Sequence, residues 1–199
     1  MSTTSGYEWY LKTNYETDLS QGDILLDLPV PMMQYSEEDP FYKIARGKIS
    51  KSIVVTQACD LENSKVSNLA ICPIEPLSVT LKKLMEKEIP GVDLAKLTSK
   101  QKEKKQKLIN EIRQGTYLDY YLLNSFQDSN VGLEYSVVLL RETFYIPVQV
   151  ASTLEKKKKE ERLRLLPPYR EHLAQAYARN FNRIGLPIDV LIDEKEIIL

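Results

Sequence analysis

The sequence has few of the residues on which covalent cross-links and zinc sites depend. Its 199 residues include two cysteines, Cys59 and Cys72, and a single histidine, His172. Two cysteines exclude a disulfide-rich scaffold. A structural zinc site would need about four nitrogen or sulfur ligands, usually in paired motifs. We therefore expect reduced thiols, no metal and no other cofactor.

The sequence also lacks a strong net charge and any long apolar run. Lys and Arg together number 27 and Asp and Glu 28, so the net charge is -1. Global basicity thus does not argue for nucleic acid, although a local basic patch still would. The stretch MSTTSGYEWYLKTNYE has no apolar signal-peptide core, and the apolar runs are too short to span a membrane. We expect a soluble, cytoplasmic protein without a membrane partner.

The first part of the chain has the pattern of antiparallel strands. An apolar run at residues 24–28 follows a Gly-Asp turn and precedes Pro29 and Pro31, which we expect to end the strand. The segments GKISKSIVVTQ and VSNLAICPIEPL are rich in β-branched residues. Because the connections are short and contain no long helix, antiparallel pairing is favoured.

Residues 77–115 have a helical pattern instead. Their leucines recur at helical spacing, and a Pro-Gly pair interrupts the pattern half-way. Thr98 is placed to cap a second helix, and Gly115 is placed to end it. The lysines near the start of this second helix are interpreted as a solvated face.

The remaining chain returns to strands and ends with a late helix. Branched and aromatic segments fill residues 116–150, the charged run at 156–164 is interpreted as an exposed linker or helix end, and a helix is predicted over 168–184. The sequence therefore predicts a single α+β domain over residues 1–199. Its architecture is expected to be an antiparallel SH3-like β-barrel, with strands at about 20–76 and 116–150, an inserted helical hairpin and a late packed helix.

The late helix has two predicted faces at about 100° per residue. The apolar face comprises Tyr169, Leu173, Tyr177, Phe181 and Ile184. The basic polar face comprises His172, Gln175, Arg179 and Arg183. Arg170 falls inside the apolar arc, where an unpaired charge is costly. We expect it to pair with Asp60 or, failing that, Asp23, although its first-turn position also lets it reach solvent.

Cys59 and Asp60 come directly after an apolar strand in SIVVTQACDLENSK. A nucleophilic pair of Cys59 with His172 is chemically feasible, because an adjacent base generates thiolate. The flanking glycines and the following helix typical of such sites are not apparent. We favour a buried, structural Cys59 and a turn formed by Asp60. A binding role for this strand end, together with Glu62, stays open.

The segments QGDILL, KSIVVTQACDLEN and SNLAICPIEPL, over about residues 20–77, resemble the layout of the MazF/PemK-type toxins. The resemblance implies a small SH3-like barrel and metal-independent RNA cleavage by an arginine and a hydroxyl residue. Lys51 stands at the arginine position and could bind phosphate, whereas Glu75 stands at the hydroxyl position and would repel it.

A second resemblance covers most of the chain. TQACDLEN together with LLPPYREHLAQAYARNFNRIGLP is similar to bacterial and phage proteins of unassigned function that carry a Q-x-C-D motif and such a helix. It implies no activity. The two resemblances together suggest a bacterial or phage defence or toxin–antitoxin context.

These observations favour a non-catalytic interaction module that binds a protein or RNA partner, with a homodimer left open. The alternative is a metal-independent, MazF/PemK-like endoribonuclease that uses cations around the barrel, including Arg46. The candidate binding residues are Lys48, Lys51, Asp60, Arg170, His172, Arg179 and Arg183. No catalytic residue is assigned. Convergence of the cations in one cleft would favour the enzyme, and scatter would favour the module.

Overall fold

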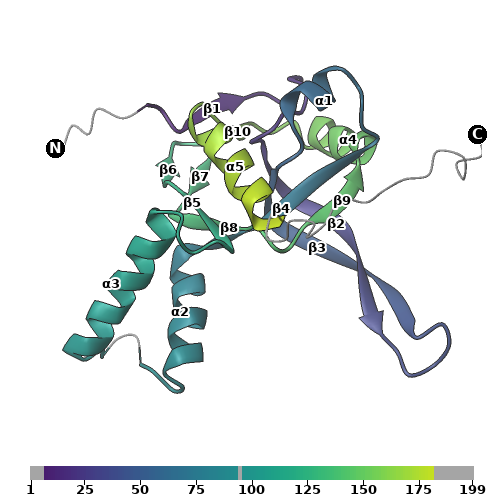
Figure 1. Cartoon of the computed structure of the whole chain (residues 1–199). Helices are drawn as coiled ribbons and strands as arrows, with labels where there is room; N and C mark the ends of the chain where they lie inside the picture. The colour runs from purple at the N-terminus through teal and green to yellow at the C-terminus, as the bar shows by residue number, and fades with distance from the viewer. Residues whose placement is uncertain (1–6, 94–95, 182–199) are drawn as a thin grey trace, which may run out of the picture.

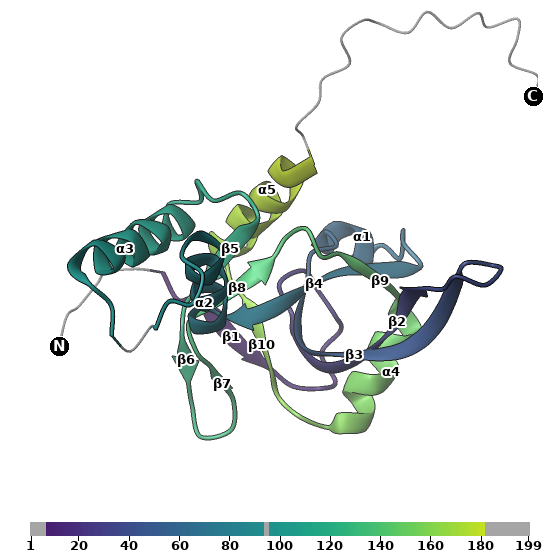
Figure 2. The same ribbon diagram turned by 90° about the horizontal axis from the view of Figure 1, so that it is seen from below.

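The chain is built around an antiparallel sheet, with a helical hairpin at one end and a β-hairpin arm at the other (Figures 1 and 2). The computed structural model describes residues 7–93 and 96–181. Its strands are β1 (Tyr10–Thr13), β2 (Ile24–Tyr35), β3 (Tyr42–Val54), β4 (Asn68–Pro76), β5 (Tyr120–Leu123), β6 (Phe126–Gln127), β7 (Gly132–Leu133), β8 (Ser136–Leu139), β9 (Phe144–Pro147) and β10 (Arg162–Leu165). Its helices are α1 (Ala58–Glu62), α2 (Leu77–Glu88), α3 (Ser99–Arg113), α4 (Val148–Lys158) and α5 (Tyr169–Phe181).

The main sheet has the strand order β2-β3-β4-β8-β5, and β9 also pairs with β4. Every strand pairing in the described ranges is antiparallel. The predicted α+β class with antiparallel strands is therefore confirmed. Within the described part of the chain no pairing returns from β5 to β2, so the sheet is not a closed barrel. The SH3-like barrel is not confirmed.

Both faces of the sheet are buried, which explains why its strands contain uninterrupted apolar runs. Successive residues of a strand point to opposite faces. Ile53 belongs to a core cluster that includes Leu173 of α5, whereas the next residue, Val54, belongs to a cluster that includes Ala151 of α4. A third cluster lies where α2 and α3 pack on β8. Helices α4 and α5 thus contribute to different apolar clusters.

The helical hairpin forms where the sequence predicted it. Leu81 and Met85 of α2 are buried together with Leu108 and Ile112 of α3. The Thr98 side chain accepts a hydrogen bond from the backbone N–H of Gln101, and the Gln101 side-chain oxygen accepts one from the backbone N–H of Thr98, so α3 begins with a capping box. Gly115 follows α3 with a φ of +68°, a conformation that favours glycine.

Strand β2 is longer than the sequence predicted. It continues through Pro29 and Pro31, which pair with Lys48 and Arg46 of β3, and ends at Tyr35. The expectation that these prolines end the strand is wrong. Proline lacks an N–H donor and is tolerated where one edge of a strand is unpaired. Strand β2 lies at the end of the sheet order, so its outer edge forms no hydrogen-bond ladder that a proline would interrupt.

The charged run at residues 156–164 is not an exposed linker. Its first residues complete α4, and its last residues lie in β10, which pairs with β1. Leu163 and Leu165 of β10 enter the core. Arg162, on the alternate face, is buried and forms an ion pair with Asp23. The high density of charged residues therefore did not indicate the half-buried strand β10. Its arginines pair with Asp23, which is far away in the sequence.

A search of the described helices found none with the length and apolar character needed to cross a membrane.

Candidate functional site

The predicted binding residues do not form one site. Lys48 is exposed on β3 and pairs with Asp27 at 2.8 Å. Lys51 lines a cavity beside β10, whereas His172 and Arg179 line a different cavity beside α5. Asp60 lies on the short helix α1. Arg183 lies outside the described residues, as does Ile184 of the predicted apolar face. The cations expected to converge are therefore divided between separate surfaces.

The predicted pairing of Arg170 with Asp60 or Asp23 is wrong. Arg170 pairs with its neighbour Glu171 at 2.8 Å, and its side chain keeps 28% of its exposure. Asp23 is buried and is already paired with Arg162 and Arg164 of β10. The first-turn position of Arg170 lets its long side chain reach the surface, as its helical angle alone did not show.

Cys59 is exposed, so its predicted burial is wrong. It lies within the short helix α1, and its thiol is 3.7 Å from acceptor oxygens of Gln57 and Asp60. In the described ranges no hydrogen bond joins either cysteine to His172, and neither cysteine lines the cavity that contains this histidine. The geometry gives no support to a Cys59–His172 nucleophilic pair.

The two thiols are expected to differ sharply in reactivity. Burial raises the pKa of Cys72 to about 11, so roughly one molecule in a thousand carries its thiolate at about pH 8. Brief treatment with iodoacetamide should therefore alkylate Cys59 and leave Cys72 unmodified, as measured by peptide mass spectrometry. Cys72 should react once the protein is unfolded in denaturant. Equal labelling of both cysteines in the folded protein would contradict the described packing.

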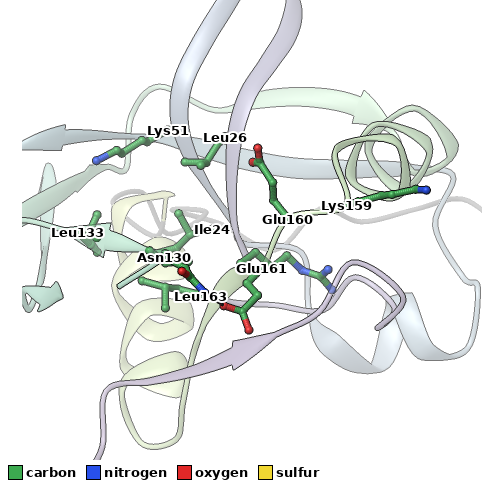
Figure 3. A pocket seen from close by; sticks show the side chains of 12 residues that line it. Ile24, Leu26, Lys51, Asn130, Leu133, Lys159, Glu160, Glu161 and Leu163 are labelled. Atoms are coloured by element: carbon green, nitrogen blue, oxygen red, sulfur yellow. Dashed lines mark hydrogen bonds between the residues drawn. The ribbon is translucent and has the colours of Figure 1, made fainter. Parts of the chain in front are cut away.

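The cavity beside β10 has a volume of about 410 Å³ and an apolar floor that includes Ile24 and Leu163 (Figure 3). Its rim carries charges of both signs. Lys51 and Lys159 lie at opposite ends and their side chains point away from each other, so they do not converge on one anion (Figure 3). Glu161 accepts hydrogen bonds from Lys12 and Asn130. Glu160 lies between the two lysines, so the rim presents no cluster of cations (Figure 3).

The second cavity, which we call the α5 cavity, has a volume of about 380 Å³. Its lining residues come from the end of α3, from β5 and from α5. In the ribbon, β5 lies between these two helices (Figures 1 and 2). Its aromatic lining residues are Trp9, Tyr120, Tyr121 and Tyr169. Its cationic and amide side chains are Arg113, Gln114, His172, Gln175 and Arg179. The predicted basic face of the late helix thus lines this cavity, as far as it is described.

The aromatic wall is held in place by contacts between distant segments. The rings of Trp9 and Tyr169 stack, with centroids 3.7 Å apart and planes 12° from parallel. The backbone N–H of Leu166 donates to the carbonyl of Trp9 at 2.8 Å. The Tyr121 hydroxyl donates to the carbonyl of Tyr169 at 2.9 Å, and burial raises the pKa of Tyr121 well above its usual value. The tyrosine therefore stays neutral and the wall is preorganised.

The polar side of the α5 cavity carries positive charge, and its side chains have no hydrogen-bond or ion-pair partners in the described chain. None of its lining residues, within the described ranges, is an aspartate or glutamate. The side chains of Arg113, Gln114, His172, Gln175 and Arg179 form no hydrogen bond or ion pair with any described residue. The His172 ring meets the edge of the Tyr169 ring, and the neighbouring Glu171 carboxylate, which pairs with Arg170, interacts with it electrostatically. Two guanidinium groups, an imidazole and two amides are therefore available to an anionic or hydrogen-bonding ligand.

Local sequence patterns predicted only the part of this cavity that α5 contributes. The spacing of His172, Gln175 and Arg179 on one helix face predicted that they would act together, and they do line one cavity. Trp9 and Arg113 come from other segments, and only the tertiary fold brings them to α5. The one signal for Trp9 was its being the only tryptophan of the chain.

The two positions implied by the toxin resemblance do not line a common cavity. Lys51 lines the cavity beside β10. Glu75 accepts hydrogen bonds from Thr80, at 2.8 Å, and from Lys83 of α2. Glu75 thus stabilises the start of α2, and no cavity described above contains both residues. No group of three or more His, Cys, Asp or Glu side chains forms a metal-ligand set among the described residues.

Comparisons with family models, curated proteins and solved structures found no match for this chain.

Proposed function

We propose that this protein is a non-catalytic module that binds single-stranded nucleic acid, with one nucleotide unit held in the α5 cavity. The observation that carries the proposal is the cavity's combination of a stacked aromatic wall with two unpaired arginines and no lining carboxylate. Proteins that bind single strands combine aromatic stacking platforms for bases with cationic groups for the backbone. The volume of about 380 Å³ is at the lower end of ligand sites, which suits a single nucleotide unit.

The roles follow from the side chains present. The Trp9 and Tyr169 rings offer an apolar surface against which a base can pack. Arg113 and Arg179 are suited to bind phosphate, because a guanidinium presents a planar fork of donors. Gln175 and His172 can donate to or accept from base or sugar atoms. In the described chain no carboxylate is hydrogen-bonded to the His172 ring to orient it, and no Ser, Thr, Cys, Asp or Glu lines the cavity, so binding without cleavage is the simpler expectation.

The test uses Trp9 as the reporter, because it is the only tryptophan. We expect short single-stranded oligonucleotides to quench its fluorescence in a saturable titration, and the matching duplex to do so far less. Arg179→Ala should weaken binding about tenfold, since loss of one base or phosphate contact costs on the order of 1–3 kcal/mol. With two phosphate contacts, the logarithm of affinity should fall with the logarithm of salt concentration with a slope of about -1.4.

Arg170→Ala provides the matched control. It removes the same side chain from the same helix, but Arg170 pairs with Glu171 and does not line the cavity. Its affinity should be unchanged. No quenching by RNA or DNA, or equal weakening by both arginine substitutions, would overturn the proposal. Strand cleavage on a denaturing gel would instead favour the endoribonuclease alternative, and a difference between RNA and DNA would identify the nucleic acid.

A further inference from the structure

The β2–β3 arm, which we define as residues 30–47, extends away from the rest of the protein (Figures 1 and 2). Its two strands pair with each other out to Tyr35 and Tyr42. Strand β3 pairs with β4 only at residues 52–54, so the arm lies outside the sheet. An extended hairpin with no third strand is marginally stable unless another surface covers it.

One face of the arm is apolar and largely exposed. Directly opposed residues of paired strands share a face, as do residues two apart. Met33 opposes Ile44, and Tyr35 opposes Tyr42. Their exposures are 74%, 69%, 81% and 42% in that order. Four adjacent large apolar side chains on one projecting surface are typical of a protein interface.

The opposite face is partly covered by the arm itself. Met32 lies over Gly47, where a β-carbon would come within 2.4 Å of its side chain. Residues 45, 47 and 49 on this face are half-buried, whereas residues 42, 44, 46 and 48 on the apolar face are all exposed. On the opposite face exposure is confined to Met32, Gln34 and Lys43 toward the tip of the arm, so the face that carries Met33 and Ile44 is the more exposed of the two.

The charges along this face indicate what covers it. Arg46 and Lys48 lie on the same face as Ile44, nearer the body of the protein, because they are two and four residues away in the strand. The turn at the far end is acidic, with Glu37, Glu38 and Asp39. The face thus runs from basic through apolar to acidic. Lys48 is paired with Asp27, whereas Arg46 forms no ion pair with any described residue, so Arg46 supplies the unpaired positive charge of the stem.

We propose that two copies of this protein associate through their β2–β3 arms, packed face to face and antiparallel about a two-fold axis. In this arrangement the apolar centres cover each other, and the acidic turn of each arm meets the basic stem of the other. A two-fold interface requires a surface complementary to itself, and a basic–apolar–acidic order meets this condition when one copy is reversed. The inference does not depend on nucleic-acid binding.

Sedimentation velocity over a range of protein concentrations tests the proposal. The unmodified protein should form dimers, and Ile44→Glu should raise the dimer dissociation constant on the order of tenfold or more. Lys43→Glu is the matched control on the opposite face and should leave the dimer intact. Both residues are exposed, so folding should tolerate either change.

A charge exchange tests the antiparallel geometry. Arg46→Glu alone should weaken association, because it faces the partner's acidic turn, and so should Glu38→Lys alone. The double variant should restore association. A monomer at all concentrations, a dimer indifferent to Ile44→Glu, or single charge changes without rescue would each overturn the proposal. Quenching of Trp9 by oligonucleotides should be unchanged in the arm variants, which separates this outcome from failure of the α5 cavity.

Discussion

Asp23→Asn is expected to lower the free energy of unfolding by about 3–5 kcal/mol, because breaking one side of a buried ion pair leaves an uncompensated charge. Asp23 has no exposed surface. Its carboxylate accepts from Arg162 Nε at 3.0 Å, from Arg164 Nε at 2.5 Å and from the backbone of Ser20 at 3.0 Å. Asparagine keeps the shape but removes the charge and one acceptor, while the Arg162 side chain remains only 3% exposed.

Urea denaturation followed by circular dichroism would measure this loss. The matched control is Asp27→Asn, which removes an aspartate paired with Lys48 on the surface, where the carboxylate is 56% exposed. We expect it to change stability by less than about 1 kcal/mol. Similar effects of the two substitutions would show that the Asp23 cluster is not the buried network described.

The Asp23 cluster has this large expected effect because it joins three distant segments. Arg162 also donates to the carbonyls of Asn14 and Thr17, at 2.9 and 2.6 Å. The loop after β1, the start of β2 and strand β10 are thereby tied to one carboxylate. Since β10 leads directly into α5, the cluster also helps to set where α5 begins.

Elements whose signals are local were predictable from the sequence. Strand β4 coincides with a segment rich in β-branched residues, and α3 has both a capping residue and a terminal glycine. The type and approximate position of both elements could therefore be predicted from the sequence. Strand β10 was not predicted because Arg162 and Arg164 belong to a charged run that is typical of a solvent-exposed segment. Only the fold shows that Asp23 pairs with both arginines. The length of β2 was missed because edge position, which tolerates proline, is a property of the whole sheet.

The candidate site likewise has one part that could be predicted from the sequence and one part that could not. One helix face of α5 could be predicted from its 3.6-residue period, and its described residues, His172, Gln175 and Arg179, share a cavity. The aromatic wall depends on Trp9, which lies more than 150 residues before Tyr169 and stacks on it. No local pattern connects them. Likewise, the isolation of Lys51 from His172 follows from sheet order, which the sequence leaves unspecified.

The docking of α5 gives the second large expected effect. Leu173→Ala should lower the free energy of unfolding by about 3 kcal/mol, because it removes a fully buried side chain and leaves a cavity. Leu173 has no exposed surface and packs in the cluster that contains Ile53 and Val138. Leu173 is the most deeply buried contact of α5 with this core. It directly follows His172 in the sequence.

Phe181→Ala is the informative control, since the sequence assigned both residues to the same apolar face of the helix. In the structure Phe181 is 63% exposed, and its ring meets the edge of Tyr177 with centroids 5.1 Å apart. Removing a largely exposed ring should therefore cost less than about 1 kcal/mol. Urea denaturation of both variants would measure the difference. A larger loss for Phe181→Ala than for Leu173→Ala would mean that α5 packs through its end, and that His172 and Arg179 do not lie beside Trp9 and Tyr169 as described.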